Sequence, residues 1–155
     1  MELFSDEWMQ AYLVEWNKDP NLAAKLSQIH FKATICYGFK DEKTPRGIMV
    51  VEEGEAVRAG KYDGEKDYNW DLRASKERWG KWLLSGMSMG KMVKAYMSGQ
   101  IKFVTGDYGS MISNPKMAGP FIHSFTVMGI VGKDADEAAA IEAARATEDE
   151  GRDDE

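Results

Sequence analysis

The sequence predicts an α+β fold, in which a five-stranded, mostly antiparallel curved sheet carries helices on one face and encloses an apolar cavity. Three observations support this fold class. Apolar residues recur at two-residue spacing in some segments and at three- and four-residue spacing in others. The strand-like segments between residues 31 and 74 are joined by short connections, which favours antiparallel pairing. Seven of the ten methionines lie between Met87 and Met128, and such flexible side chains suit a pliable cavity.

Two helices are expected before the sheet. Ser5 is an N-cap candidate, and the apolar residues after it recur at helical spacing. These residues are Trp8, Met9, Tyr12, Leu13 and Trp16. Asp19 and Pro20 end this helix and begin a second one, because Asp is a good N-cap and Pro is tolerated at the first helical position. The second helix directs three side chains inward, namely Leu22, Leu26 and Ile29.

Alternating apolar and polar residues begin at His30 and predict four consecutive strands. One face of the first strand carries Phe31, Ala33, Ile35, Tyr37 and Phe39. A second strand runs from Ile48 to Glu52, and a tight turn at Glu53 and Gly54 leads into a third at about residues 56–62. The fourth strand presents Tyr68, Trp70, Leu72 and Ala74 on one face. The short connections predict that these four strands form an antiparallel meander.

Helices and one further strand complete the predicted fold. Ser75 and Ser88 are N-cap candidates for two helices. Their apolar stripes are Trp79, Trp82 and Leu83 in the first, and Met89, Met92, Val93, Tyr96 and Met97 in the second. A fifth strand over residues 101–105 ends at the turn Gly106-Asp107, where Asp107 is the N-cap candidate for the next helix. A short helix with Met111 and Ile112 follows, and after Asn114-Pro115 a last apolar helix aligns Phe121, Phe125 and Met128.

The charge distribution predicts one domain at residues 1–133 and a loosely ordered acidic tail at residues 134–155. The net charge is −6; residues 1–133 hold 18 basic and 16 acidic side chains, whereas residues 134–155 hold 2 and 10. An Ala- and acid-rich tail is poorly equipped to bury a helix face. The acidic tail and the lack of a basic stripe argue against nucleic acid binding. An acidic N-terminus and the lack of a long apolar run predict a cytoplasmic protein.

Polar residues provide no recognisable catalytic or metal-binding arrangement. Neither His30 nor His123 has a carboxylate or cysteine beside it at metal-ligand spacing. His123 is expected to be hydrogen-bonded in the core or at a cavity rim, and Cys36 to be an unreactive thiol. Asp71 and Arg73 share a strand face, where they would form a solvated pair or a polar anchor for a ligand head group. We therefore expect no enzymatic activity, no metal and no cofactor.

Apolar side chains from the helix stripes and the inward sheet face form the candidate ligand site. Such side chains line either a cavity or a filled core, because both look alike in sequence. The methionine excess favours the cavity. The candidate residues are Phe31, Ile35, Trp79, Trp82, Met89, Met92, Ile101, Phe103, Met111, Phe121, Phe125 and Met128.

The order of elements and several motifs resemble the sterol carrier protein type two family, in particular its small bacterial stand-alone members. The resemblance covers about Trp8 to Met128. It is carried by the strand and turn at residues 99–107, by the Trp70-Asp71-Leu72 strand before the tryptophan helix, and by residues 115–125. It implies a sheet covered by helices with a lipid tunnel between them. The chain ends in Asp-Asp-Glu instead of the peroxisomal tripeptide of eukaryotic relatives.

The resemblance also implies a function, namely non-enzymatic binding and transfer or presentation of an apolar ligand such as a fatty acid, an acyl chain or a sterol. The alternative is an accessory interaction subunit of an enzyme system acting on hydrophobic substrates, with the acidic tail as its docking element. A catalytic role is the weakest of the three interpretations, because no nucleophile, base and orienting residue can be assembled. Transient membrane contact, a protein partner for the tail, and a monomer or homodimer are all compatible with the sequence.

Overall fold

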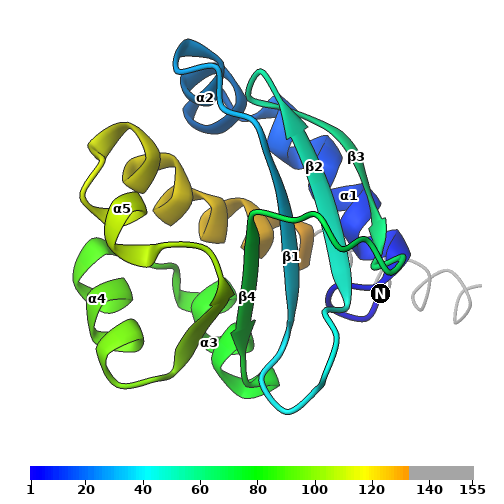
Figure 1. Ribbon diagram of the computed structural model, residues 1–155, viewed down its shortest axis with the longest axis vertical. Coiled ribbons are helices and arrows are strands. Elements are labelled where there is room, and N and C mark those ends of the chain that lie inside the picture. Colours follow the sequence, from blue (N-terminus) through cyan, green and yellow to red (C-terminus); the bar gives the residue numbers. More distant parts are fainter. Residues whose placement is uncertain (133–155) are drawn as a thin grey trace, which may run out of the picture.

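The computed structural model describes residues 1–132, which form five strands and the helices around them (Figure 1). The architecture is α+β, with an open five-stranded sheet, as the sequence predicts. The predicted tail at residues 134–155 lies outside the described residues. Within residues 1–132, no helix is both long and apolar enough to cross a bilayer.

The N-terminal helices begin at the predicted caps. Helix α1 (Asp6–Lys18) starts where the Ser5 hydroxyl accepts a hydrogen bond from the amide of Trp8 at 3.2 Å. Asp19 caps the next segment by accepting from the amide of Asn21 at 2.8 Å, with Pro20 at the first helical position. This segment starts as a π-helical turn, η1 (Pro20–Ala24), and continues as the short α2 (Lys25–Gln28).

Strands β1 (Ala33–Phe39), β2 (Gly47–Glu52) and β3 (Glu55–Lys61) form the predicted antiparallel meander. The β2–β3 turn places both Glu53 and Gly54 at positive φ, 50° and 81°, as a two-residue hairpin turn requires. The predicted position of the fourth strand is wrong. Strand β4 (Trp70–Ala74) does not pair with β3 but lies parallel to β1 on its other side.

Residues 62–69 explain this difference, because they connect β3 to β4 by crossing the sheet instead of turning back in a hairpin (Figure 1). Strand β5 (Ile101–Thr105) then pairs antiparallel to β4 at the edge of the sheet. The strand order is therefore β3-β2-β1-β4-β5, with β1 at the centre. The sheet is mixed, with one parallel and three antiparallel pairs.

The later helices also begin at predicted caps. Ser75 caps α3 (Lys76–Ser85), Ser88 caps α4 (Met89–Met97), and Asp107 caps the short α5 (Tyr108–Ile112), each through its side-chain oxygen. Residues 115–132 are helical and pack against α3 through Phe125, which stacks on Trp79 at 5.9 Å between ring centroids. Gly129 allows this approach, because a Cβ there would collide with the carbonyl of Leu83.

The helices cover one face of the sheet, and the segment 62–69 crosses the other face (Figure 1). The core between sheet and helices is rich in aromatic residues. Phe4 lies at its centre, fully buried, with ring centroids of Trp79 at 5.0 Å, Trp8 at 5.3 Å and Tyr37 at 5.5 Å. The backbone of Phe4 has a φ of 63°, which is unusual for a bulky residue. This conformation directs the Phe4 side chain into the core just before α1 begins. The sequence pattern did not indicate this role for Phe4.

Candidate ligand-binding site

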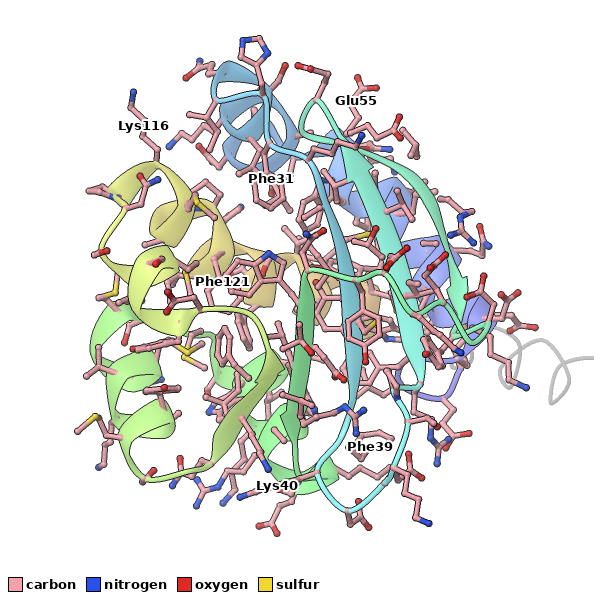
Figure 2. The ribbon with its side chains drawn as sticks, viewed as in Figure 1. Phe31, Phe39, Lys40, Glu55, Lys116 and Phe121 are labelled. Carbon is pink, nitrogen blue, oxygen red and sulfur yellow. The ribbon has the colours of Figure 1, made fainter. Side chains whose placement is uncertain are left out.

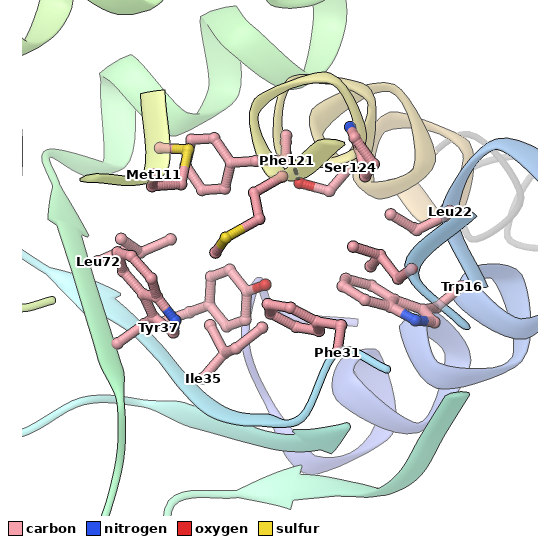
Figure 3. A pocket seen from close by; sticks show the side chains of 13 residues that line it. Trp16, Leu22, Phe31, Ile35, Tyr37, Leu72, Met111, Phe121 and Ser124 are labelled. Atoms are coloured by element: carbon pink, nitrogen blue, oxygen red, sulfur yellow. Dashed lines mark hydrogen bonds between the residues drawn. The ribbon is translucent and has the colours of Figure 1, made fainter. Parts of the chain in front are cut away.

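An apolar pocket lies between the helix-covered face of the sheet, the corner where α1 meets η1 and α2, and the segment from α5 into the 115–132 helix (Figure 3). Three groups of residues line it. The helical corner contributes Trp16, Leu22 and Leu26; the sheet side contributes Phe31, Ile35, Tyr37, Trp70 and Leu72; the C-terminal side contributes Met111, Met117, Pro120, Phe121 and Ser124. These three groups are far apart in sequence, so the pocket exists only in the folded chain.

The pocket is narrow. The space that the centre of a water-sized sphere can reach is about 40 Å³, which corresponds to room for about three water molecules at roughly 10–15 Å³ each. Side chains therefore fill most of the site, and a long apolar ligand requires some of them to move. Met111 and Met117 are suited to this because methionine is unbranched and flexible. Phe31, Met117 and Phe121 are only half-buried, so this part of the wall also borders solvent.

In the part of the chain that the structure describes, the wall has hydroxyl groups and indole N–H groups as its only polar side-chain groups. The Tyr37 hydroxyl lies 3.4 Å from that of Tyr12, and the Ser124 hydroxyl donates to the carbonyl of Phe121 at 2.5 Å. Burial raises the pKa of Tyr37 well above its ordinary value, so its hydroxyl stays neutral. Among residues 1–132, no lining residue carries a charge. The wall can therefore hold apolar groups well, whereas a buried carboxylate would lack a cationic partner.

A shallow hollow continues from the pocket to the surface. It shares Phe31, Trp70, Met111 and Met117 with the pocket and adds polar side chains from Lys32, Asn69, Asp107 and Ser110. Gly106 in this hollow packs directly against the ring of Trp70, since its φ is 108° and a Cβ would collide with that ring. A ligand in the pocket could thus keep a polar end in water at the hollow.

A polar contact joins two of the segments that carry lining residues. The His123 Nε2 lies 2.8 Å from Oδ2 of Asp19 and joins the 115–132 helix to the start of η1. Both segments carry pocket-lining residues, so this contact fixes the two walls relative to each other. His123 is thus hydrogen-bonded, as the sequence predicts, and its place at the rim of the site stays a prediction.

The twelve sequence-predicted residues fall into three groups. Phe31, Ile35, Met111 and Phe121 line the pocket. Six lie buried in the core beside it, namely Trp79, Trp82, Met92, Ile101, Phe125 and Met128, while Phe103 is half-buried and packs on Phe121 at 6.0 Å. Met89 lies apart from the pocket, 43% exposed on α4. A ligand contact by any of these residues stays a prediction.

Sequence reasoning did not select most of the wall. Trp16, Leu22 and Leu26 belong to the inward stripes of the first two helices, and this pattern alone could have added them to the candidate site. Tyr37 and Leu72 follow from the strand alternation in the same way. Ser124 and Met117 had no comparable signal, because only the helix position over residues 115–132 brings them to the pocket.

Asp71 and Arg73 lie on the other face of the sheet, since Leu72 between them points into the pocket. Their predicted solvated patch is wrong, because both are buried. Arg73 donates from Nε and Nη2 to the two carboxylate oxygens of Asp71 at 2.6 and 3.0 Å, and from Nη1 to the carbonyl of Glu42 at 2.8 Å. Neighbouring Cys36 is also buried, and burial raises the pKa of its thiol to about 12, with Asp71 adding to the shift. This cluster supports the β-sheet and does not face the pocket.

Comparison with solved structures identifies the class of fold. Sterol carrier protein 2 superposes with a TM-score of 0.62 at 18% identity, over 83% of this chain and 98% of that protein. A conserved hypothetical protein from Thermus thermophilus, described as a candidate sterol carrier protein, gives 0.55 at 17% identity over 86% and 90%. A ubiquinone synthesis protein, UbiJ-SCP2, gives 0.52 at 14% identity over 79% and 88%. No family model matches the sequence, and no curated protein matches it.

The chain therefore has the sterol carrier protein 2 fold, and the resemblance seen in the sequence is confirmed at the level of the fold. The match covers nearly the whole length of sterol carrier protein 2, so the likeness is not limited to one motif.

Proposed function

We propose that this protein binds an apolar ligand, such as a fatty acid, an acyl chain or a sterol, in the pocket beneath the β-sheet and transfers or presents it without chemical change. The observation that carries the proposal is the composition of the wall, which is apolar and uncharged and opens through half-buried Phe31, Trp70 and Met117 into a polar hollow. The fold shared with sterol carrier protein 2 supports the same role.

The energetics require no strong polar contact. Each methylene removed from water contributes about 0.8 kcal/mol, so ten of them give roughly 8 kcal/mol before ordering costs. Opening the narrow pocket reduces this gain, because wall side chains must change rotamer. Ten methylenes give micromolar affinity only before these costs are subtracted, so micromolar binding requires a longer apolar ligand that buries more methylenes.

Displacement of a fluorescent fatty acid tests the proposal. The Met117→Trp variant places a larger side chain in the half-buried wall and should exclude about two methylenes of the ligand. At about 0.8 kcal/mol each, affinity falls roughly 15-fold. Val14→Trp is the control, because Val14 is exposed on α1 and does not line the pocket. A wild-type chain that ignores acyl ligands and sterols at micromolar concentration would refute the proposal.

A second candidate function is that of an accessory subunit in an enzyme system acting on hydrophobic substrates. One structural neighbour, named as a ubiquinone synthesis protein, favours it. In that case residues 134–155 would serve as the docking element, and their deletion should remove a partner from a pull-down. The same partners before and after deletion would argue against this role of the tail.

A further inference from the structure

Helix α4 exposes an apolar stripe. Met89, Val93 and Met97 recur at i, i+4 and i+8 and therefore lie along one side of the helix. They are 43%, 42% and 78% exposed. Leu84, in the last turn of α3 before the corner that leads into α4, is 83% exposed. Within residues 1–132 no element covers this stripe, although α4 lies beside α3 and α5 at the outer edge of the molecule (Figure 1).

The same region is strongly basic. Residues 76–102 hold six basic side chains and one acidic side chain, Glu77, in a chain of net charge −6. Lys91 and Lys94 of α4 are exposed and have no ion-pair partner among residues 1–132. Glu77 already pairs with Lys81 at 3.5 Å. A partner of this face must therefore be apolar in part and negatively charged.

Aromatic contacts connect α4 to the ligand pocket, whose wall includes Phe121 (labelled in Figure 2). Tyr96 stacks on Tyr108 with 3.7 Å between ring centroids and meets the edge of Phe103 at 6.0 Å. Phe103 in turn lies 6.0 Å from Phe121 and from Trp70, which both line the pocket. The exposed stripe thus lies on an element only two aromatic contacts away from the pocket wall.

We propose that α4 docks on an anionic lipid bilayer, with Met89, Val93 and Met97 inserted at the interface and Lys91 and Lys94 at the lipid head groups. Basic amphipathic helices with apolar stripes bind such surfaces in this way. Lysine is depleted in protein–protein interfaces, which favours lipid over a protein partner. The proposal rests on the proposed lipid-binding function and gives that function a site for loading and release.

Sedimentation of the full-length chain with lipid vesicles tests the proposal. We expect binding to phosphatidylcholine vesicles that contain phosphatidylglycerol, weaker binding at high salt, and little binding to pure phosphatidylcholine. Each lysine near an anionic surface contributes about fivefold, so Lys91→Glu with Lys94→Glu should weaken binding at least 25-fold. Val93→Ser with Met97→Ser should also weaken it. The matched control on α1 is Val14→Ser with Lys18→Glu, which changes exposed residues of the same types and should have little effect.

Equal binding to both vesicle types, or unchanged binding of both α4 variants, would overturn the proposal. Vesicle binding that occurs only after removal of residues 134–155 would assign the basic face to the acidic segment of the chain itself and would also overturn it. Displacement of the fluorescent fatty acid in solution separates the two proposals. An α4 variant that loses vesicles but keeps the fatty acid supports membrane docking, whereas a wild-type chain that binds vesicles but no apolar ligand refutes only the pocket function.

Discussion

Replacing Tyr108 by phenylalanine should stabilise this protein. The Tyr108 ring is 9% exposed beneath α4, and its hydroxyl is buried without a hydrogen-bond partner within residues 1–132. Folding removes this hydroxyl from water and returns no hydrogen bond, which costs about 1–3 kcal/mol. The stacking on Tyr96 at 3.7 Å and the edge contact with Phe103 at 5.3 Å involve the ring alone, so Tyr108→Phe keeps both.

We expect Tyr108→Phe to raise the free energy of unfolding by about 1 kcal/mol, the lower end of this range, since neighbouring side chains adjust. For a chain of this size the melting temperature should rise by about 2–4 °C. Urea denaturation with an unchanged m-value measures the difference. The matched control is Tyr62→Phe, whose hydroxyl donates to the carbonyl of Glu65 at 2.7 Å, so that variant should lose about 0.5–1.5 kcal/mol.

The pH dependence provides a second measurement on the same variant. Burial raises the pKa of Tyr108 in the folded state above its ordinary value of 10.0, and nearby Tyr96 adds to the shift. Below pH 10 both states keep the proton and the stabilisation is complete. Above pH 10 the unfolded chain releases the proton first, so the wild type loses stability that Tyr108→Phe keeps. A variant that is less stable than wild type at neutral pH would refute the assignment of an unpaired hydroxyl.

Two further predictions concern the cluster on the outer face of the sheet. Arg73→Met should lower the free energy of unfolding by about 3–5 kcal/mol, because it leaves the buried carboxylate of Asp71 unpaired. The double variant Asp71→Leu with Arg73→Met should restore most of this loss, as measured by urea denaturation. An Arg73→Met variant as stable as wild type would contradict the reasoning. The Cys36 thiol should resist alkylation at pH 9 until the chain is unfolded, and rapid alkylation of the native thiol would be inconsistent with its burial. The pKa of this thiol is about 12 in the folded chain and roughly 8.5 in the unfolded chain. Its contribution to stability should therefore be complete below about pH 8.5 and decline from there to about pH 12.

Local features of this fold could be predicted from sequence because their causes are local. Ser5, Ser75, Ser88 and Asp107 each precede an apolar stripe at helical spacing, and each accepts a hydrogen bond from an amide of the first turn. The hairpin at Glu53 and Gly54 likewise depends on two adjacent residues. The pairing of β4 with β1 depends on residues some 35 positions apart, and no spacing rule distinguishes it from pairing with β3.

The site was predictable only in part for the same reason. Alternation in β1 places Ile35 and Tyr37 on the inward face, so their position in the wall follows from sequence. Helix stripes do not indicate which apolar residues meet a gap and which meet other side chains. Met92 and Met111 look equivalent in sequence, but the structure buries Met92 in the core and places Met111 on the pocket.

The central position of β1 has a consequence for the order of folding. Residues 33–61 form the β1–β2–β3 meander, whose strands pair with their neighbours along the chain. The edge of β1 that faces away from β2 pairs with β4, which follows β3 after a connection that crosses the sheet. Parallel pairing of this kind forms slowly. We therefore expect the N-terminal half to present an unpaired, apolar strand edge during synthesis until residue 74 has emerged, and this edge exposes the nascent chain to aggregation.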